Sequence, residues 1–259
     1  MKTDAVIDHI VNWLESYCTA AQMAGFVVGV SGGIDSAVTS TLCARTGKKT
    51  FALNMPIHQA SRQRSLAGRQ IKWLEKRFAN VKGMDVELTA AFEAIKKTLP
   101  DEITGDLSMA NTRSRLRMIT LYAVSTHHRM LVAGTGNKVE DFGVGFYTKY
   151  GDGGVDLSPI ADLLKSEVYA VAKKLGIMAD IIEAPPTDGL WQDGRTDESQ
   201  IGATYDELEW AMGFVAGPDT ESVLTDRQKE VLSIYKKFHD RNRHKMGSIP
   251  VCQITKELR

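Results

Sequence analysis

Hydrophobic residues follow two patterns along this chain: short continuous runs, and longer stretches with apolar positions three or four residues apart. The short runs are rich in valine, alanine and leucine, which predicts buried strands at 26–30, 50–55, 81–88 and 130–135. The helical spacing predicts helices over about the first two dozen residues and at 35–45, 59–78, 90–99, 106–128, 163–175, 205–214 and 226–239. Strands and helices alternate, and buried parallel strands are typically continuous apolar runs. We therefore expect an α/β fold with an open, mostly parallel, twisted sheet and helices on both faces.

Two stretches interrupt this alternation. Five glycines crowd residues 143–154, which indicates a backbone that turns sharply or approaches a ligand closely. Residues 183–202 contain Pro185 and Pro186 and several acidic residues without periodicity, so we expect a mobile loop there. A polar tail follows residue 239. Because no repeat or abrupt change in composition divides the chain, we expect residues 1–259 to form a single, Rossmann-like domain.

The composition excludes several classes of protein. With 259 residues and 43% hydrophobic content, the chain can bury a sizeable core and is neither disordered nor fibrous. Lys+Arg (32) equal Asp+Glu (32), which leaves no basic excess for nucleic acid. The start of the chain lacks a signal-peptide pattern, and no apolar run approaches the roughly 20 residues of a membrane span. Three cysteines without paired spacing argue against disulfides or a zinc site. We expect a cytoplasmic protein with no nucleic-acid or membrane partner.

The strongest chemical signal is Ser31-Gly32-Gly33-Ile34-Asp35-Ser36, between a predicted strand and a predicted helix. Glycines let backbone N–H groups face a phosphate, and the start of a helix adds a positive dipole end. The segment is not a Walker A loop, because the lysine of that motif is missing. Asp35 would repel a phosphate unless a cation lay between them, which indicates Mg²⁺.

This segment resembles the pyrophosphate loop of the N-type ATP pyrophosphatases, which include GMP synthetase, asparagine synthetase, tRNA-modifying ligases and NAD synthetases. Within that group, Thr148-Lys149-Tyr150-Gly151-Asp152-Gly153-Gly154, with Gly134-Thr135 before it and Pro185-Pro186-Thr187 after it, is similar to the ammonia-dependent NAD synthetases over nearly the whole chain. Tyr205-Asp206-Glu207-Leu208 and His244-Lys245 also fit that family.

The resemblance implies a ligase that amidates deamido-NAD to NAD with ATP and ammonia, through an adenylated carboxylate, and releases AMP and pyrophosphate. It implies a homodimer with ATP as co-substrate and Mg²⁺ as cofactor, and it assigns catalytic roles to Asp35 and Lys165. The implied ATP contacts are Gly29, Val30, Ser31, Gly32, Gly33, Ile34, Asp35, Ser36, Thr135, Lys165 and Thr187. The implied Mg²⁺ ligands are Asp35 and Glu140, and the implied substrate contacts are Arg115, Lys149, Asp156, His244 and Lys245.

One departure from the family concerns the stretch from Glu140 to Lys149, which is a residue longer than in some members. The register of residues 143–146 is therefore left open. Arg115 shares a helical stripe with Asn111, Met118 and Tyr122, whereas Arg113 and Arg117 point away from that stripe. By composition alone, arginines on such a helix are typical of a solvated face.

The residues leave two other functions open. One is another ATP pyrophosphatase, similar to GMP synthetase or to a tRNA-modifying enzyme; the absence of a basic excess and of zinc-spaced cysteines argues against the tRNA enzyme. The other is a regulatory module that binds ATP without turnover and would have no use for Asp35, Glu140 and Lys165 together. We expect free ammonia as the nitrogen donor, because no cysteine lies in a setting typical of a glutaminase nucleophile.

The apolar face of the first helix and the strip Val231, Ile234, Tyr235 and Phe238 suggest surfaces for the implied dimer.

Overall fold

The computed structural model describes residues 1–59, 61–187, 190, 195–217 and 224–259. In chain order the main elements are α1 (Thr3–Ala20), β1 (Gly25–Gly29), α2 (Ile34–Arg45), β2 (Lys49–Asn54), α3 (Ser61–Arg77), β3 (Val81–Asp85), α4 (Thr89–Thr98), α5 (Asp106–His128), β4 (Leu131–Val132), the π-helical turn η2 (Val139–Val144), α6 (Lys165–Leu175), α7 (Ala179–Ile182), α8 (Asp197–Ile201), α9 (Tyr205–Ala216) and α10 (Asp226–Met246). Short 3-10 turns lie at Asp101–Ile103 and Lys256–Leu258.

The sheet has the strand order β3-β2-β1-β4, and each pair of neighbouring strands is parallel. In this register Val27 of β1 lies opposite Phe51 of β2 and Val132 of β4. The chain builds the sheet outward from β1 to β3 and then returns to add β4 on the other side of β1. Ligands of open parallel sheets bind at the carboxyl ends of the strands where the order reverses, which here is between β1 and β4. The predicted fold class is confirmed.

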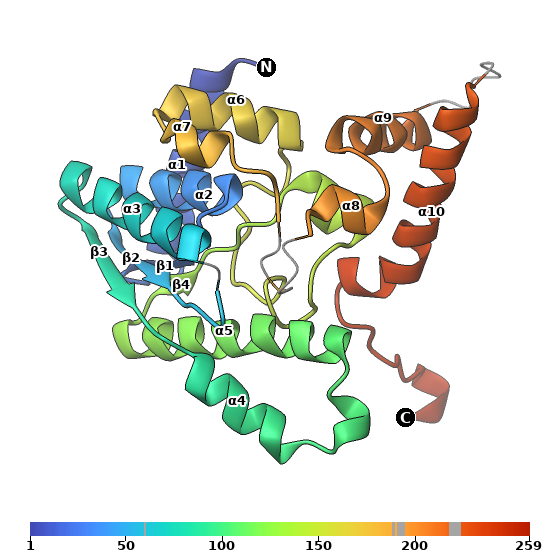
Figure 1. The fold of residues 1–259 in the computed structure, drawn as a ribbon, viewed down its shortest axis with the longest axis horizontal. Helices are drawn as coiled ribbons and strands as arrows, with labels where there is room; N and C mark the ends of the chain where they lie inside the picture. Colours follow the sequence, from blue (N-terminus) through green and yellow to red (C-terminus); the bar gives the residue numbers. More distant parts are fainter. Residues whose placement is uncertain (60, 188–189, 191–194, 218–223) are drawn as a thin grey trace.

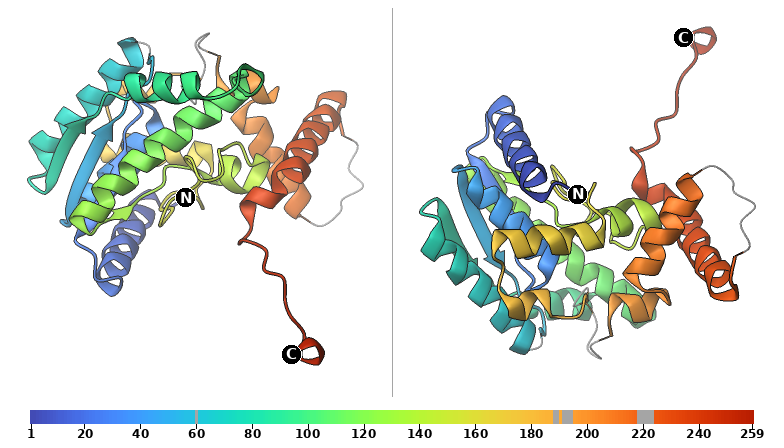
Figure 2. Two further views of the ribbon diagram at one scale, coloured as in Figure 1. Left: turned by 90° about the horizontal axis from the view of Figure 1, so that it is seen from below. Right: turned by 90° about the horizontal axis from the view of Figure 1, so that it is seen from above.

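Helices cover both faces of the sheet, as Figures 1 and 2 show. Because neighbouring residues of a strand point to opposite faces, β1 contributes to two cores. Phe26 and Val28 pack with α1, α2 and α6 on one face. Val27 packs with residues of α4 and α5 on the other face. α3 lies on the same side as α2, with which it shares a smaller cluster.

A further apolar cluster lies beside the sheet, where η2, α9 and α10 meet (Figure 1). Val231 and Tyr235 of α10 are 1% and 4% exposed because they fill this cluster, and Ile234 and Phe238 pack against it. Leu14 of α1 is likewise buried, in the core that α1, α2 and α6 form with Phe26 and Val28 of the sheet. The prediction that these two helix faces form a dimer surface is therefore wrong, since both are covered within the chain.

Several boundaries differ from the predictions. α1 ends at Ala20, and a turn through Gln22, whose φ is 54°, leads into β1. Residues 197–201, predicted as loop, form α8, which begins with Thr196 accepting a hydrogen bond from the Ser199 N–H. α10 continues to Met246, so that His244-Lys245 lie in a helix and not in a tail. The Lys245 ammonium donates to the carbonyls of Gly145 and Tyr147, which ties this last turn to the rest of the molecule.

Both edges of the sheet have a backbone N–H bound by a carboxylate. On β3 the outward Gly83 N–H donates to Glu75 Oε1 at 2.8 Å. On β4 the outward Val132 N–H donates to Asp156 Oδ2, also at 2.8 Å. Beyond β4, the sheet continues only as a bridge between Ala133 and Leu157 among the described residues.

Within the described ranges, none of the helices combines the length and the apolar character that crossing a bilayer requires.

Candidate functional site

The Ser31–Ser36 turn connects β1 to α2 and is held by its own hydroxyl groups. The Ser31 N–H donates to Ser36 Oγ and the Gly33 N–H donates to Ser31 Oγ, both at 3.2 Å. Gly32 has a φ of +90°, and a Cβ there would lie 2.8 Å from the Gln63 carbonyl oxygen of α3. The turn therefore requires glycine at this position, both for its conformation and for its close contact with α3.

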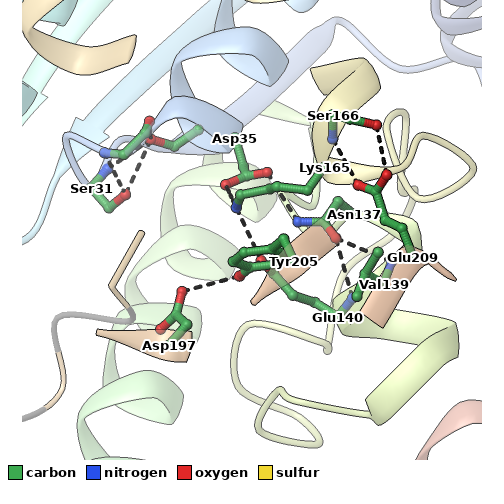
Figure 3. A network of polar contacts seen from close by, with 12 residues as sticks. Ser31, Asp35, Asn137, Val139, Glu140, Lys165, Ser166, Asp197, Tyr205 and Glu209 are labelled. Atoms are coloured by element: carbon green, nitrogen blue, oxygen red, sulfur yellow. Dashed lines mark hydrogen bonds and ion pairs between the residues drawn. The ribbon is translucent and has the colours of Figure 1, made fainter. Parts of the chain in front are cut away.

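Three charged side chains meet at the carboxyl ends of β1 and β4 (Figure 3). The Lys165 ammonium lies 2.7 Å from Asp35 Oδ2 and 3.1 Å from Glu140 Oε1. The Lys165 side chain is 3% exposed, and the two carboxylates are 18% and 16% exposed. Burial lowers the pKa of Lys165, but Asp35 and Glu140 outweigh it and hold that pKa well above its ordinary value. Lys165 is therefore a charged ammonium that contacts both carboxyl groups.

Burial raises the pKa of Glu140 above its ordinary value, and nearby Asp35 adds to this effect. Lys165 opposes both. The ammonium is thus the group that stabilises two buried carboxylates so close together.

Asn137 connects these carboxylates and is fully buried. Its side-chain N–H donates to Asp35 Oδ1 at 3.1 Å, while its Oδ1 accepts the backbone N–H of Val139 at 3.1 Å and that of Glu140 at 3.2 Å. One amide therefore orients Asp35 and caps the turn that carries Glu140. Asn137 was not among the predicted site residues, although its place two residues after the end of the predicted strand 130–135 was a signal that could have identified it.

Tyr205, the first residue of α9, lies beneath this cluster. Its hydroxyl donates to Glu140 Oε1 at 2.5 Å and lies 3.2 Å from Asp197 Oδ2. Burial and the nearby carboxylates raise the pKa of Tyr205, so the phenol stays protonated and can donate. The Asp197 N–H in turn donates to the Pro186 carbonyl, which joins this network to the segment that follows α7.

Asp35, Glu140, Lys165 and Asp197 line a cavity of about 230 Å³. Nearly all of the predicted ATP contacts contribute to its wall, namely Gly29, Val30, Ser31, Gly33, Ile34, Asp35, Ser36, Thr135, Lys165 and Thr187. The remaining one, Gly32, lies behind the turn against α3. The predicted loop 183–202 contributes Ala184, Pro185, Pro186 and Thr187, while its residues 188–189 and 191–194 lie outside the described residues.

Arg117 of α5 also lines this cavity, so its interpretation as part of a solvated face is wrong. Its guanidinium donates to the Met55 carbonyl at 3.0 Å and to Gln59 Oε1 at 2.8 Å. Arg113 likewise stacks 4.5 Å from the Phe92 ring centroid and donates to the Leu190 carbonyl. Neither set of contacts could be predicted from local sequence, because the partner residues come from other segments of the chain.

A second cavity, of about 760 Å³, lies on the other side of α5 residue Met118, which lines both cavities. Its wall contains Arg115, Tyr122, Tyr147, Lys149, Tyr150 and Lys245. Three of the five predicted substrate contacts, Arg115, Lys149 and Lys245, are thus brought together. Three cations and three tyrosines form a wall suited to an anionic ligand with aromatic rings.

The other two predicted substrate contacts lie differently. Asp156 binds the Tyr122 hydroxyl at 2.9 Å and so touches the wall of the second cavity indirectly. The His244 imidazole is exposed and bonds to the Arg241 carbonyl of its own helix. His244 contacts the second cavity through its backbone carbonyl, which accepts a hydrogen bond from the Lys149 ammonium at 3.1 Å.

The stretch from Glu140 to Lys149 begins in the π-helical turn η2. A π-helix uses more residues per turn than an α-helix. Gly145 then ends the turn with a φ of 63°. Glu140 faces Lys165, and Lys149 lines the second cavity.

The donor set also tests whether the site suits Mg²⁺. In the described part of the chain, no group of three or more His, Cys, Asp or Glu side chains could hold a metal ion. Mg²⁺ is, however, commonly bound through one or two carboxylates together with substrate phosphates. Asp35 and Glu140 beside the Ser31–Ser36 turn would meet that requirement if a nucleotide supplied the remaining oxygens.

Comparison with known proteins gives consistent findings. The family model described as NAD synthase matches residues 6–248. The NH3-dependent NAD+ synthetase of Mesoplasma florum is 36% identical over 245 residues, which cover 93% of this chain and 96% of that protein. The solved structure of NMN synthetase from Francisella tularensis has a TM-score of 0.85 and 32% identity, covering 98% of this chain and 100% of that one. NH3-dependent NAD synthetase from Campylobacter jejuni, solved with a nitrate ion, has a TM-score of 0.80 and 27% identity, with 98% and 100% covered.

Proposed function

Because this chain belongs to the NAD synthase family, we propose that its two cavities carry out the amidation of deamido-NAD to NAD with ATP and ammonia. The observation that carries the proposal is the meeting of Asp35, Glu140 and Lys165 beside the Ser31–Ser36 turn. An ATP-binding module without turnover would have no need for this arrangement. The two cavities correspond to the two large substrates, ATP in the first and the dinucleotide in the second.

The reaction has two steps. A carboxylate oxygen of the pyridine ring attacks the α-phosphorus of ATP, the bond between the α-phosphorus and the bridging oxygen breaks, and pyrophosphate leaves. Ammonia then attacks the acyl carbon, the bond to the AMP oxygen breaks, and the added nitrogen loses a proton. Neither step requires a nucleophilic side chain, so catalysis consists of positioning and of stabilising negative charge on phosphate oxygens.

Lys165 is the residue best placed to stabilise that charge. Its ammonium lies in the wall of the first cavity at the start of α6, and its flexible stem can follow a moving phosphate. The backbone N–H groups of the Ser31–Ser36 turn and the start of α2 act on the phosphates from the other side. Asp35 and Glu140 would hold Mg²⁺, which when bound neutralises phosphate charge.

A second candidate substrate is nicotinic acid mononucleotide, which would give nicotinamide mononucleotide. It is favoured by the likeness in structure to the NMN synthetase of Francisella tularensis, at a TM-score of 0.85. Both substrates present the same pyridine carboxylate and a phosphate, so the cations of the second cavity would suit either. The other ATP pyrophosphatases, similar to GMP synthetase or to tRNA-modifying enzymes, have no observation of this kind in their favour.

The proposal extends to the surroundings of the enzyme. A single functional domain is supported by the family match over residues 6–248.

A homodimer is supported by exposed apolar side chains near the second cavity, Ile119 at 65% and Tyr150 at 58% exposure. Sedimentation at micromolar concentration tests the dimer, and a mass of one chain would contradict it. The balanced charge supports the absence of a nucleic-acid partner. A cytoplasmic location without a membrane partner stays a prediction from the sequence.

One experiment tests the function. The protein is incubated with ATP, Mg²⁺, ammonium and either deamido-NAD or nicotinic acid mononucleotide, and the pyridine and adenine products are separated by chromatography. We expect NAD, AMP and pyrophosphate from deamido-NAD. A higher kcat/KM with the mononucleotide would establish the second candidate, whereas ADP and phosphate as products would contradict both.

Asp35→Asn and Glu140→Gln serve as the matched variants in this assay. Each keeps the shape of the side chain and removes a charged ligand. We expect each to lower kcat at least about a hundredfold while the melting temperature shows that the fold survives. A near-normal rate at saturating Mg²⁺ would show that the substituted residue is not a ligand.

A further inference from the structure

Helix α9 presents two side chains to the first residues of α6 (Figure 3). Tyr205 and Glu209 lie four positions apart on α9, and residues with this spacing share one face of a helix. Both reach the segment Lys165-Ser166, with which α6 begins. This contact between helices adjoins the charged site directly.

Tyr205 touches two of the three charged groups at once. Its hydroxyl donates to Glu140 Oε1 at 2.5 Å, and the Lys165 ammonium lies 4.6 Å from the centroid of its ring. A cation over an aromatic face is attracted to it, most strongly where water is excluded. Tyr205 is only 5% exposed, so this contact is shielded from solvent.

Glu209 holds the backbone at the same place. The Ser166 N–H donates to one oxygen of its carboxylate at 2.8 Å, and the Ser166 hydroxyl donates to the other at 2.7 Å. A carboxylate at the start of a helix satisfies a free N–H group and interacts well with the helix dipole. Glu209 thereby fixes the position from which the Lys165 side chain extends.

We propose that Tyr205 and Glu209 are positioning residues that hold the Lys165 ammonium at the place where it meets the reacting phosphate. Glu209 fixes the position of the α6 backbone. Tyr205 fixes the position of the ammonium relative to the Glu140 carboxylate. Neither touches substrate, and both act through Lys165. This inference rests on the proposed function, the amidation of deamido-NAD with ATP and ammonia. Misplacing such a charge by a fraction of an ångström lowers a rate without abolishing binding of the other substrate.

The test uses Tyr205→Phe and Glu209→Gln in the full chain. Tyr205→Phe keeps the ring beneath the ammonium and removes the hydroxyl, while Glu209→Gln keeps the shape and removes the charge. The matched control is Glu207→Gln on the same helix, because Glu207 binds Thr204 and Arg227, away from Lys165. For each protein we would measure kcat, both KM values, the melting temperature and, by calorimetry, the Kd for ATP.

We expect Tyr205→Phe and Glu209→Gln each to lower kcat about tenfold and to weaken ATP binding several-fold, since each loses a hydrogen bond to a charged group. The KM for deamido-NAD should stay within about twofold, because that substrate binds in the other cavity. Glu207→Gln should leave both kcat and the Kd for ATP unchanged.

Two results would overturn the inference. One is a kcat and a Kd for ATP within about twofold of the wild type in both variants. The other is a loss of kcat that follows the melting temperature equally in all three variants, which indicates a structural role. A wild-type protein that binds ATP but amidates no pyridine nucleotide contradicts the proposed function instead, and the Kd values still test the positioning.

Discussion

Lys165 determines the charge of the site, because its ammonium lies between two carboxylates that would otherwise repel each other. Lys165→Met keeps the length of the side chain and removes this charge, leaving two hard oxygen ligands unpaired. We expect the nucleotide-free variant to bind Mn²⁺, used as a spectroscopic probe, at least about tenfold more tightly than the wild type. Electron paramagnetic resonance measures the free ion. The double variant with Asp35→Asn is the control, and equal affinity in wild type and Lys165→Met would contradict the prediction.

Gly32 offers a second test at the residue scale, with Gly47 as its control. Both have positive φ, +90° and +73°, but a Cβ at Gly47 meets nothing within 4 Å, whereas one at Gly32 lies 2.8 Å from the Gln63 carbonyl oxygen. Alanine at either position is strained in the backbone, and only at Gly32 must the turn also move away from α3. We expect Gly32→Ala to weaken ATP binding at least about tenfold and Gly47→Ala to leave it unchanged. Calorimetric titration with ATP measures this, and equal effects would show that the contact with α3 is unimportant.

Some residues of the site could be identified from the sequence alone, and others could not. Asp35 follows from the turn motif and its chemistry, while Glu140 and Lys165 follow from the family resemblance, and the structure brings all three within contact. Tyr205 lies in a segment that fits the family, but its contacts and those of Glu209 could not be found in this way, because the residues they hold lie at least 40 positions earlier in the chain. A side chain that acts by holding another one leaves no local pattern.

At the scale of elements, the start of α9 shows how a helix is fixed by a cap and an ion pair. Thr204 accepts the Glu207 N–H, the Glu207 carboxylate accepts the Thr204 N–H, and Arg227 of α10 binds the same carboxylate. The bonds from Arg227 and Thr204 lower the pKa of Glu207 to about 2 from an ordinary 4.5.

Glu207 should therefore stabilise the fold above pH 4.5 and lose this effect as the pH falls toward 2, because the unfolded chain takes up the proton first. Glu207→Gln should lower the free energy of unfolding by about 1 kcal/mol at pH 7, since the pair is partly exposed. Denaturant unfolding at several pH values measures the difference. A difference that persists unchanged near pH 2 would contradict this origin.

Most helices were predictable because their burial follows the 3.6-residue period, and most strands because buried parallel strands are continuous apolar runs. The exceptions depend on contacts distant in sequence. β4 is only two residues long, although its apolar run continues, because Asp156 and Leu157 pair with the chain around it. α10 extends past the apolar pattern because Lys245 is anchored to the carbonyls of Gly145 and Tyr147.

At the scale of the whole molecule, the source of nitrogen can be tested. Cys18 and Cys43 are buried, and burial raises the pKa of both, so neither resembles an activated nucleophile. Cys252 is exposed and lies in the segment after α10. We expect this chain to make NAD from ammonium but not from glutamine, with a rate that rises with the fraction of NH3. Synthesis from glutamine that a thiol-alkylating reagent abolishes, while synthesis from ammonium persists, would contradict this.

The two carboxylates at the sheet edges bear on how this protein behaves when it is crowded. An open parallel sheet exposes backbone groups that can recruit a strand from another molecule, and this is a common route to aggregation. Here Glu75 occupies the outward N–H of Gly83 at one edge, and Asp156 occupies that of Val132 at the other. Two copies of this chain therefore cannot join their sheets at either point without breaking a charge-assisted hydrogen bond. A strand added at either point would therefore have to displace a carboxylate before its backbone could pair with the sheet.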